Sequence, residues 1–114
     1  MTLADIIQQL ELTPLTRPQD YGALAPTAGY ASDLLSCVMA AAPRGGIWVT
    51  LQAHTNIVAV AALLDLCAVI VTEGAEPDPS TIEKANEEGV ILLSTPRSTF
   101  EVVGRLWEMG LRAP

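Results

Sequence analysis

Residues 45–72, GGIWVTLQAHTNIVAVAALLDLCAVIVT, decide the fold of this chain. The apolar run 47–51 is typical of a buried strand, and a second such run follows at 68–71. Between them, the polar segment 52–56 leads into the apolar stretch 57–66, which predicts a helix. Strand, helix and strand in this order predict two parallel strands joined by a right-handed crossover.

The same alternation continues downstream. The pattern predicts a helix over 80–88, a buried strand over 90–93 and a final helix that ends at Met109. Cap and turn residues mark the boundaries of both helices. They are Asp78 with Pro79, or alternatively Ser80 with Glu83, and Gly89 for the first helix, then Ser98 with Glu101 and Gly110 for the second.

Upstream of the central stretch, a capping box of Thr2 and Asp5 predicts the start of an N-terminal helix. Pro14 restricts residues 11–16 to an edge strand or an extended connection. Another strand is expected near Thr27, in which Gly29 serves a positive φ or a close backbone approach. A helix capped by Ser32 should follow, with Asp33 near its positive end. The apolar stripes of the two helices are Leu3, Ile6, Ile7 and Leu10, and Leu35, Val38, Met39 and Ala42.

Together these elements predict one α/β domain over residues 1–114. Its architecture should have three layers, α/β/α, around a mostly parallel but mixed sheet. A chain of 114 residues is long enough to bury a core without disulfides or metals. Half of the residues are hydrophobic and few of these are aromatic, so Val, Ile, Leu and Ala must fill that core.

The charge distribution excludes two classes of partner. The net charge is −7, and the six cationic side chains are scattered along the chain. Nucleic acids and anionic membranes require clustered basic residues, so neither is an expected partner.

The sequence favours a cytoplasmic location. It shows no signal peptide and no apolar run near the roughly 20 residues of a membrane span. Cys37 and Cys67 lie in apolar runs without a C-x-x-C spacing, so we expect buried thiols in a reducing compartment.

The final helix has more apolar surface than one contact needs. Its apolar residues cover over half of its circumference, whereas a helix packed on one core shows a narrower stripe. We therefore expect Phe100, Val103 and Trp107 to form a homodimer interface.

A candidate ligand site follows from the parallel sheet. The carboxyl ends of the strands meet at one edge, where helix N-termini also offer unpaired N–H groups. Such an edge suits an anionic or hydroxyl-rich ligand. It should gather Asp33, Gln52, His54, Thr55, Asn56, Thr72, Glu73, Ser94 and Thr95, with Thr50, Gly74 and Ser98 close by.

His54, the only histidine, permits three interpretations. It or Thr55 caps the following helix while Asn56 bonds locally, or it contacts a ligand. Alternatively, the chain is a small enzyme in which His54 is a general base that Glu73 orients. No cofactor is expected: one histidine and two separated cysteines do not supply a zinc site, and the sequence has no phosphate-binding loop motif.

Two segments resemble the DRTGG domain family. They are residues 27–36, TAGYASDLLS, and residues 50–61, TLQAHTNIVAVA; the tail from Leu93 to Leu106 is similar too. The chain departs from the family pattern in the motif that names it. No clear Asp-Arg pair precedes Thr27, and Ala28 replaces the usual glycine.

The resemblance implies an α/β/α domain similar to the N-terminal domain of HPr kinase/phosphorylase. Related domains accompany phosphotransacetylase and CBS-containing pyrophosphatases as regulatory or dimer-forming parts. By this resemblance the chain is a non-catalytic regulatory or interaction domain. It would act as a homodimer that binds a small ligand, such as a nucleotide or a phosphorylated compound, or that docks on a partner enzyme or signalling protein. A kinase activity does not transfer, because the phosphate loop is absent.

Overall fold

A computed structural model describes all residues from 1 to 114. It contains a five-stranded mixed sheet with the strand order β1-β5-β4-β3-β2, in which β1 alone is antiparallel. This confirms the α/β class predicted from the alternation. The elements are α1 (Leu3–Leu10), β1 (Thr13–Pro14), the 3-10 turn η1 (Tyr21–Ala23), β2 (Gly29–Ala31), α2 (Leu35–Ala41), β3 (Ile47–Thr50), α3 (Asn56–Leu63), β4 (Ala68–Val71), α4 (Pro79–Glu88), β5 (Leu92–Ser94) and α5 (Thr99–Met109).

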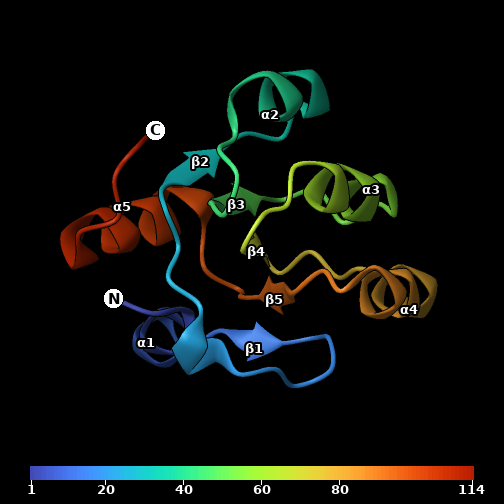
Figure 1. Ribbon diagram of the computed structural model, residues 1–114, viewed down its shortest axis with the longest axis horizontal. Coiled ribbons are helices and arrows are strands. Elements are labelled where there is room, and N and C mark those ends of the chain that lie inside the picture. The colour runs from blue at the N-terminus through green and yellow to red at the C-terminus, as the bar shows by residue number, and fades with distance from the viewer.

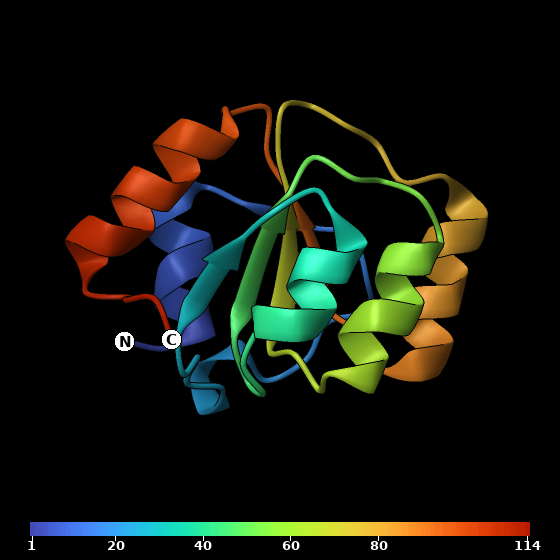
Figure 2. The same ribbon diagram turned by 90° about the horizontal axis from the view of Figure 1, so that it is seen from above.

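Two helical layers enclose the sheet. Strands β2 to β5 follow one another in a single direction across the sheet, so right-handed crossovers place α2, α3 and α4 on the same face. Helices α1 and α5 cover the opposite face (Figure 1). Figure 2 shows the same layers from above, with the C-terminus returning to the side of β2.

Alternate residues of each strand enter the two cores. Val49, Ile70 and Leu93 pack with α1 and α5, whereas Trp48 and Val71 pack with α2, α3 and α4. Trp48 is fully buried, and its indole Nε1 donates to the Ser32 carbonyl over 2.8 Å. A buried indole N–H needs such a partner, so this bond fixes the end of β2 against β3.

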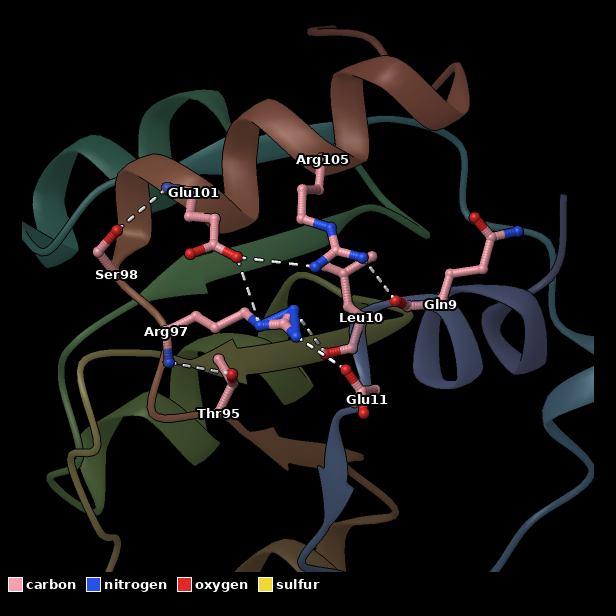
Figure 3. A network of polar contacts seen from close by, with 8 residues as sticks. All are labelled: Gln9, Leu10, Glu11, Thr95, Arg97, Ser98, Glu101 and Arg105. Atoms are coloured by element: carbon pink, nitrogen blue, oxygen red, sulfur yellow. Dashed lines mark hydrogen bonds and ion pairs between the residues drawn. The ribbon is translucent and has the colours of Figure 1, made fainter.

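Arginines of the β5–α5 segment join α1 to α5 (Figure 3). Arg97 Nη1 donates to the Leu10 carbonyl over 3.4 Å, and Arg105 Nη2 donates to the Gln9 carbonyl over 2.8 Å. Glu101 Oε2 lies between them, 3.4 Å from Arg97 Nε and 3.6 Å from Arg105 Nη1. The last turn of α1 has no basic residue of its own, so α5 supplies the cations that its exposed carbonyls favour.

Most of the predicted helix boundaries are confirmed. Thr2 and Asp5 form the capping box of α1, and Ser98 accepts from Glu101 N–H at the start of α5. For α4, Asp78 is the cap and Pro79 the first residue, so the alternative with Ser80 is wrong. Gly89 and Gly110 end α4 and α5 in the left-handed conformation, at φ 71° and 106°.

Several predictions around α2 and α3 are wrong. Leu34, not Ser32, is the N-cap of α2. The Ser32 hydroxyl accepts from the N–H of Leu34 itself, which precedes the helix, so it caps none of the helical N–H groups. Of the predicted stripe on α2, only Val38 is buried. Helix α3 ends at Leu63 rather than Leu66, since the chain turns at Asp65 with φ 53°.

The two cysteines differ from the prediction as well. Cys37 is exposed on α2, and Cys67 is only half-buried. Burial raises the pKa of the Cys67 thiol above its usual value. Separately, none of the helices combines the length and the apolar content that crossing a bilayer requires.

We predict that α1 is an integral part of the core. Ile6→Ala removes a side chain with no exposed surface and should lower the free energy of unfolding by about 2–5 kcal/mol. Gln8→Ala, on the exposed side of α1, should change it by less than about 0.5 kcal/mol. Urea denaturation followed by circular dichroism measures both. Equal midpoints for the two variants would contradict this packing.

The α4 cap should make stability depend on pH. Hydrogen bonds from the Ser80 hydroxyl and the Thr81 N–H lower the pKa of Asp78 below its usual 3.8. A lowered pKa in the folded state stabilises the fold above the unfolded value, and this stabilisation is lost as the pH falls through the folded value. The difference in urea midpoint between wild type and Asp78→Asn should therefore shrink from neutral pH to about pH 3. A difference in midpoint that stays constant over this range would contradict a stabilising role of the ionised Asp78 carboxylate.

Candidate functional site

The predicted site residues lie where β2, β3, β4 and β5 reach their carboxyl ends. The parallel strands place these ends along one edge of the sheet. Within this edge, the hydrogen bonds divide the residues into separate groups. Each group ties two elements of the fold together, and the local contacts show which polar atoms remain available for a ligand.

The first group ties β2 to β3 through Asp33. Its Oδ1 accepts from Thr50 Oγ1 and from the Leu51 N–H, each over 2.8 Å. Gln52 Nε2 donates to the Asp33 carbonyl over 3.1 Å. Asp33 therefore holds the end of β3 and does not cap α2, which corrects its expected place at that helix. The Thr50 side chain is fully buried, so its hydroxyl is structural.

The second group, at the start of α3, contains the most accessible polar side chains. His54, Thr55 and Asn56 are all exposed. His54 Nδ1 accepts from the Asn56 N–H over 3.2 Å and also contacts Asn56 Oδ1. Thr55 Oγ1 lies 2.8 Å from Thr81 Oγ1, which ties the starts of α3 and α4 together. This geometry fits the capping interpretation of His54 and leaves its Nε2 free of any partner within the chain.

The third group joins β4 to the start of α5. Glu73 adopts φ 62°, and its Oε2 accepts from the Thr99 N–H over 2.7 Å. The Thr72 and Thr99 hydroxyl oxygens are 2.6 Å apart, and the Glu73 N–H donates to the Arg97 carbonyl over 2.8 Å. The Glu73 carboxylate is therefore used to cap α5. His54 bonds to its own helix instead, and no hydrogen bond joins it to Glu73 as a base to its orienting carboxylate.

The end of β5 completes the edge. Thr95 is buried, and its Oγ1 accepts from the Arg97 N–H over 3.2 Å. Its carbonyl accepts from the Gly74 N–H over 3.1 Å. Ser94 is half-buried within the strand. Thr95 therefore stabilises the turn after β5, and neither residue presents a fully exposed side chain at this edge.

The helix N-termini at this edge differ in the groups that close them. Carboxylates close two: Asp78 caps α4, and Glu73 together with the Ser98 hydroxyl caps α5. The imidazole of His54 caps α3, whose N-cap residue Thr55 contributes no side-chain bond. An added anion is repelled by a carboxylate but not by an imidazole, which carries no negative charge. The start of α2 also has no side-chain cap, but it begins with Leu34 and Leu35. The start of α3, with three exposed polar side chains, is therefore the best place at this edge for an anionic or hydroxyl-bearing ligand.

The edge offers no strong cation for such a ligand. Arg97 follows β5, but its guanidinium reaches to the end of α1 (Figure 3). No group of three or more His, Cys, Asp or Glu side chains is placed to hold a metal ion. Recognition would therefore depend on hydrogen bonds from side chains and from the helix start.

A second concave surface lies on the other side of the molecule and was not predicted. It is an apolar groove of about 210 Å³ between α5, β2 and the C-terminal segment. The segment returns to the sheet because the Gly29 N–H donates to the Arg112 carbonyl over 2.9 Å. A Cβ at Gly29 would lie 3.1 Å from Leu111 Cδ2, so this glycine serves the close approach and not a positive φ. The groove is lined by Gly29, Tyr30, Ala31, Val49, Val103, Leu106, Trp107, Leu111, Arg112 and Ala113.

Two of the predicted interface residues, Val103 and Trp107, line this groove, and Phe100 lies one turn before Val103 on α5. The side chains of Phe100, Val103 and Trp107 are 91%, 37% and 53% exposed. Arg112 stacks over the Trp107 ring, 4.5 Å from its centroid, and donates to the Trp107 carbonyl. The apolar surface of α5 could be recognised from the sequence, because its apolar residues cover over half of the helix circumference. The groove could not, because it depends on a C-terminal segment that has no helical or strand periodicity.

Two comparisons with known proteins give matches. The family model of the DRTGG domain matches residues 30–109. A crystal structure described as the CBS and DRTGG domains of the regulatory region of Clostridium perfringens pyrophosphatase, complexed with the activator diadenosine tetraphosphate, superposes with a TM-score of 0.75 at 19% identity. The match covers 90% of this chain but 44% of that one, so the chain spans less than half of the relative. None of the curated proteins compared with the chain matches it.

The family match extends from Tyr30 in β2 to Met109 at the end of α5. It covers residues 30–36 of the first stretch on which the resemblance was based, the whole of the second stretch, 50–61, and the tail that ends at Leu106. The fold as a whole agrees with that of the solved structure. This chain therefore belongs to the DRTGG domain family.

Proposed function

We propose that this chain is a non-catalytic regulatory domain that binds a small polar ligand at the start of α3. The observation that carries this proposal is the exposed triplet His54-Thr55-Asn56, which lies at a helix N-terminus that no carboxylate caps. Nucleotides and phosphorylated metabolites fit this chemistry, because they combine anionic oxygens with hydroxyl and amide groups. The regulatory region of the solved relative is described as a complex with a nucleotide activator, which supports the same ligand class.

The electrostatics of the edge narrow the expected binding mode. Asp33, Glu73 and Asp78 lie at the same edge, and Arg97, which follows β5, pairs with Glu11 and Glu101 instead. A ligand with several unshielded phosphates would therefore be repelled unless a cation accompanies it. A single phosphate on the α3 N-terminus, with a base or sugar against Gln52 and His54, avoids most of this repulsion.

We further propose that residues 1–114 act as one cytoplasmic domain that forms a homodimer through α5. Phe100, Val103 and Trp107 expose an apolar surface that has no partner within the chain. Exposed apolar patches of this kind mark protein–protein contacts. Docking on a partner enzyme would use the same surface and is the alternative if the chain proves monomeric.

The ligand proposal predicts a thermal shift. In a screen of nucleotides and phosphorylated metabolites, a ligand at about 100 times its Kd adds roughly 2.7 kcal/mol of stability. For a domain of 114 residues this raises the Tm by on the order of 10 °C. His54→Ala and Asn56→Ala should abolish the shift, whereas Gln8→Ala on α1 should retain it. A shift that survives both site variants would place the ligand elsewhere.

The dimer proposal predicts a mass in solution of twice that of one chain. Val103→Asp places a charge in the exposed apolar surface and should give a monomer, because burying an unpaired carboxylate is strongly unfavourable. Ser36→Asp adds the same charge at an exposed position of α2 on the opposite layer and should remain dimeric. Light scattering after size exclusion measures these masses. A monomeric wild type would contradict the homodimer.

A further inference from the structure

We infer that the apolar groove between α5 and β2 is a socket for Phe100 of a second copy of this chain. The inference rests on the homodimer proposed above and specifies how it is built. In this arrangement each protomer inserts its Phe100 side chain into the groove of its partner. The groove is then complete only in the pair.

Phe100 has the exposure expected of an inserted side chain. It is 91% exposed, more than any other large apolar residue of the chain, and it packs on no core cluster. The groove has the matching chemistry and size. Its volume of about 210 Å³ suits one aromatic side chain, and eight of its ten lining residues are hydrophobic. Both features belong to the same surface, since Val103 and Trp107 of α5 line the groove.

The spacing along α5 is self-complementary. Phe100 and Trp107 lie at equal distances from the midpoint between Val103 and Gly104. A two-fold axis at that midpoint would run the two α5 helices antiparallel and bring Phe100 of each protomer beside Trp107 of the other. A closed two-fold interface requires this reciprocity, in which the same patch serves on both subunits.

Gly104 supports a close approach of the two helices at that axis. It lies in the middle of α5, where glycine disfavours the helix relative to alanine. A Cβ at this position would meet no atom of the chain within 4 Å, so no packing within the protomer requires the glycine. At the crossing point of two helices, however, the missing side chain lets the backbones approach.

The available surface is sufficient for a stable pair. Phe100, Val103 and Trp107 expose on the order of 400 Å² per protomer, given the size of these side chains and their exposure. A standard interface takes about 800 Å² from each partner, so these three residues would supply about half of it. The walls of the groove and the C-terminal segment add to this area.

Reciprocal complementation tests the inference. Phe100→Ala removes the inserted ring but keeps the groove, whereas Ala31→Phe fills the groove but keeps Phe100. Each variant alone loses both contacts of the pair, and the loss of one aromatic anchor weakens association about 30-fold or more. Each homodimer should therefore dissociate about 1,000-fold more readily than wild type. A mixture of the two variants retains one intact contact and should associate only about 30-fold more weakly than wild type.

Analytical ultracentrifugation of the separate and mixed variants, one of them fluorescently labelled, measures these constants. Both altered side chains are exposed, so circular dichroism should show native folding, and rescue in the mixture itself requires folded partners. Failure of the mixture to associate better than either variant would overturn the socket. So would unweakened homodimers of both variants, although the homodimer itself would then stand. A monomeric wild type would instead refute the homodimer proposal, and the socket with it.

Discussion

The handedness of the crossovers is the constraint on which this structure depends. Strands β2 to β5 advance in one direction, so every connecting helix must lie on the same face of the sheet. The opposite face would remain exposed without helices from the two ends of the chain. Helices α1 and α5 meet this need, and Arg97 and Arg105 join them by donating to the last carbonyls of α1 (Figure 3).

The same strand order also explains why the polar edge has no deep crevice. In doubly wound sheets a reversal of strand order opens a crevice for ligands. No reversal occurs between β2 and β5, and the concave surface of about 210 Å³ lies instead beside the edge strand β2. The candidate ligand site at α3 is consequently an exposed surface of polar groups. This agrees better with recognition by a regulatory domain than with chemistry in a closed site.

The sequence was sufficient for the features that depend on local patterns. The buried strands at 47–51 and 68–71, the cap at Asp78 and the stops at Gly89 and Gly110 follow from periodicity and turn chemistry, and the structure confirms them within one or two residues. The polar residues of the edge were also found, because parallel strands must end together.

The remaining features depend on contacts between distant segments. Glu73 was paired with His54 in the sequence analysis because both residues follow strands. In the structure, the Glu73 carboxylate accepts from the Thr99 N–H at the start of α5. Asp33 was expected to interact with the N-terminus of α2. Its carboxylate instead accepts two hydrogen bonds from the end of β3, from the Thr50 hydroxyl and the Leu51 N–H. No local pattern could reveal the groove, which is formed when the Arg112 carbonyl meets the Gly29 N–H across 83 residues.

Both borders of the sheet are protected against strand-to-strand aggregation. The Leu15 N–H of β1 points inward and donates to the Leu92 carbonyl, so the backbone nitrogen of Pro14 faces the outer side of the sheet. Proline has no N–H, so this position offers no donor to another strand. On the opposite border, the Arg112 carbonyl already occupies the outward N–H of Gly29. Short, blocked borders of this kind prevent the sheet from extending into a neighbouring molecule or a fibril. A protein with such borders can expose a large apolar helix face while avoiding the irreversible assembly that open β-edges promote.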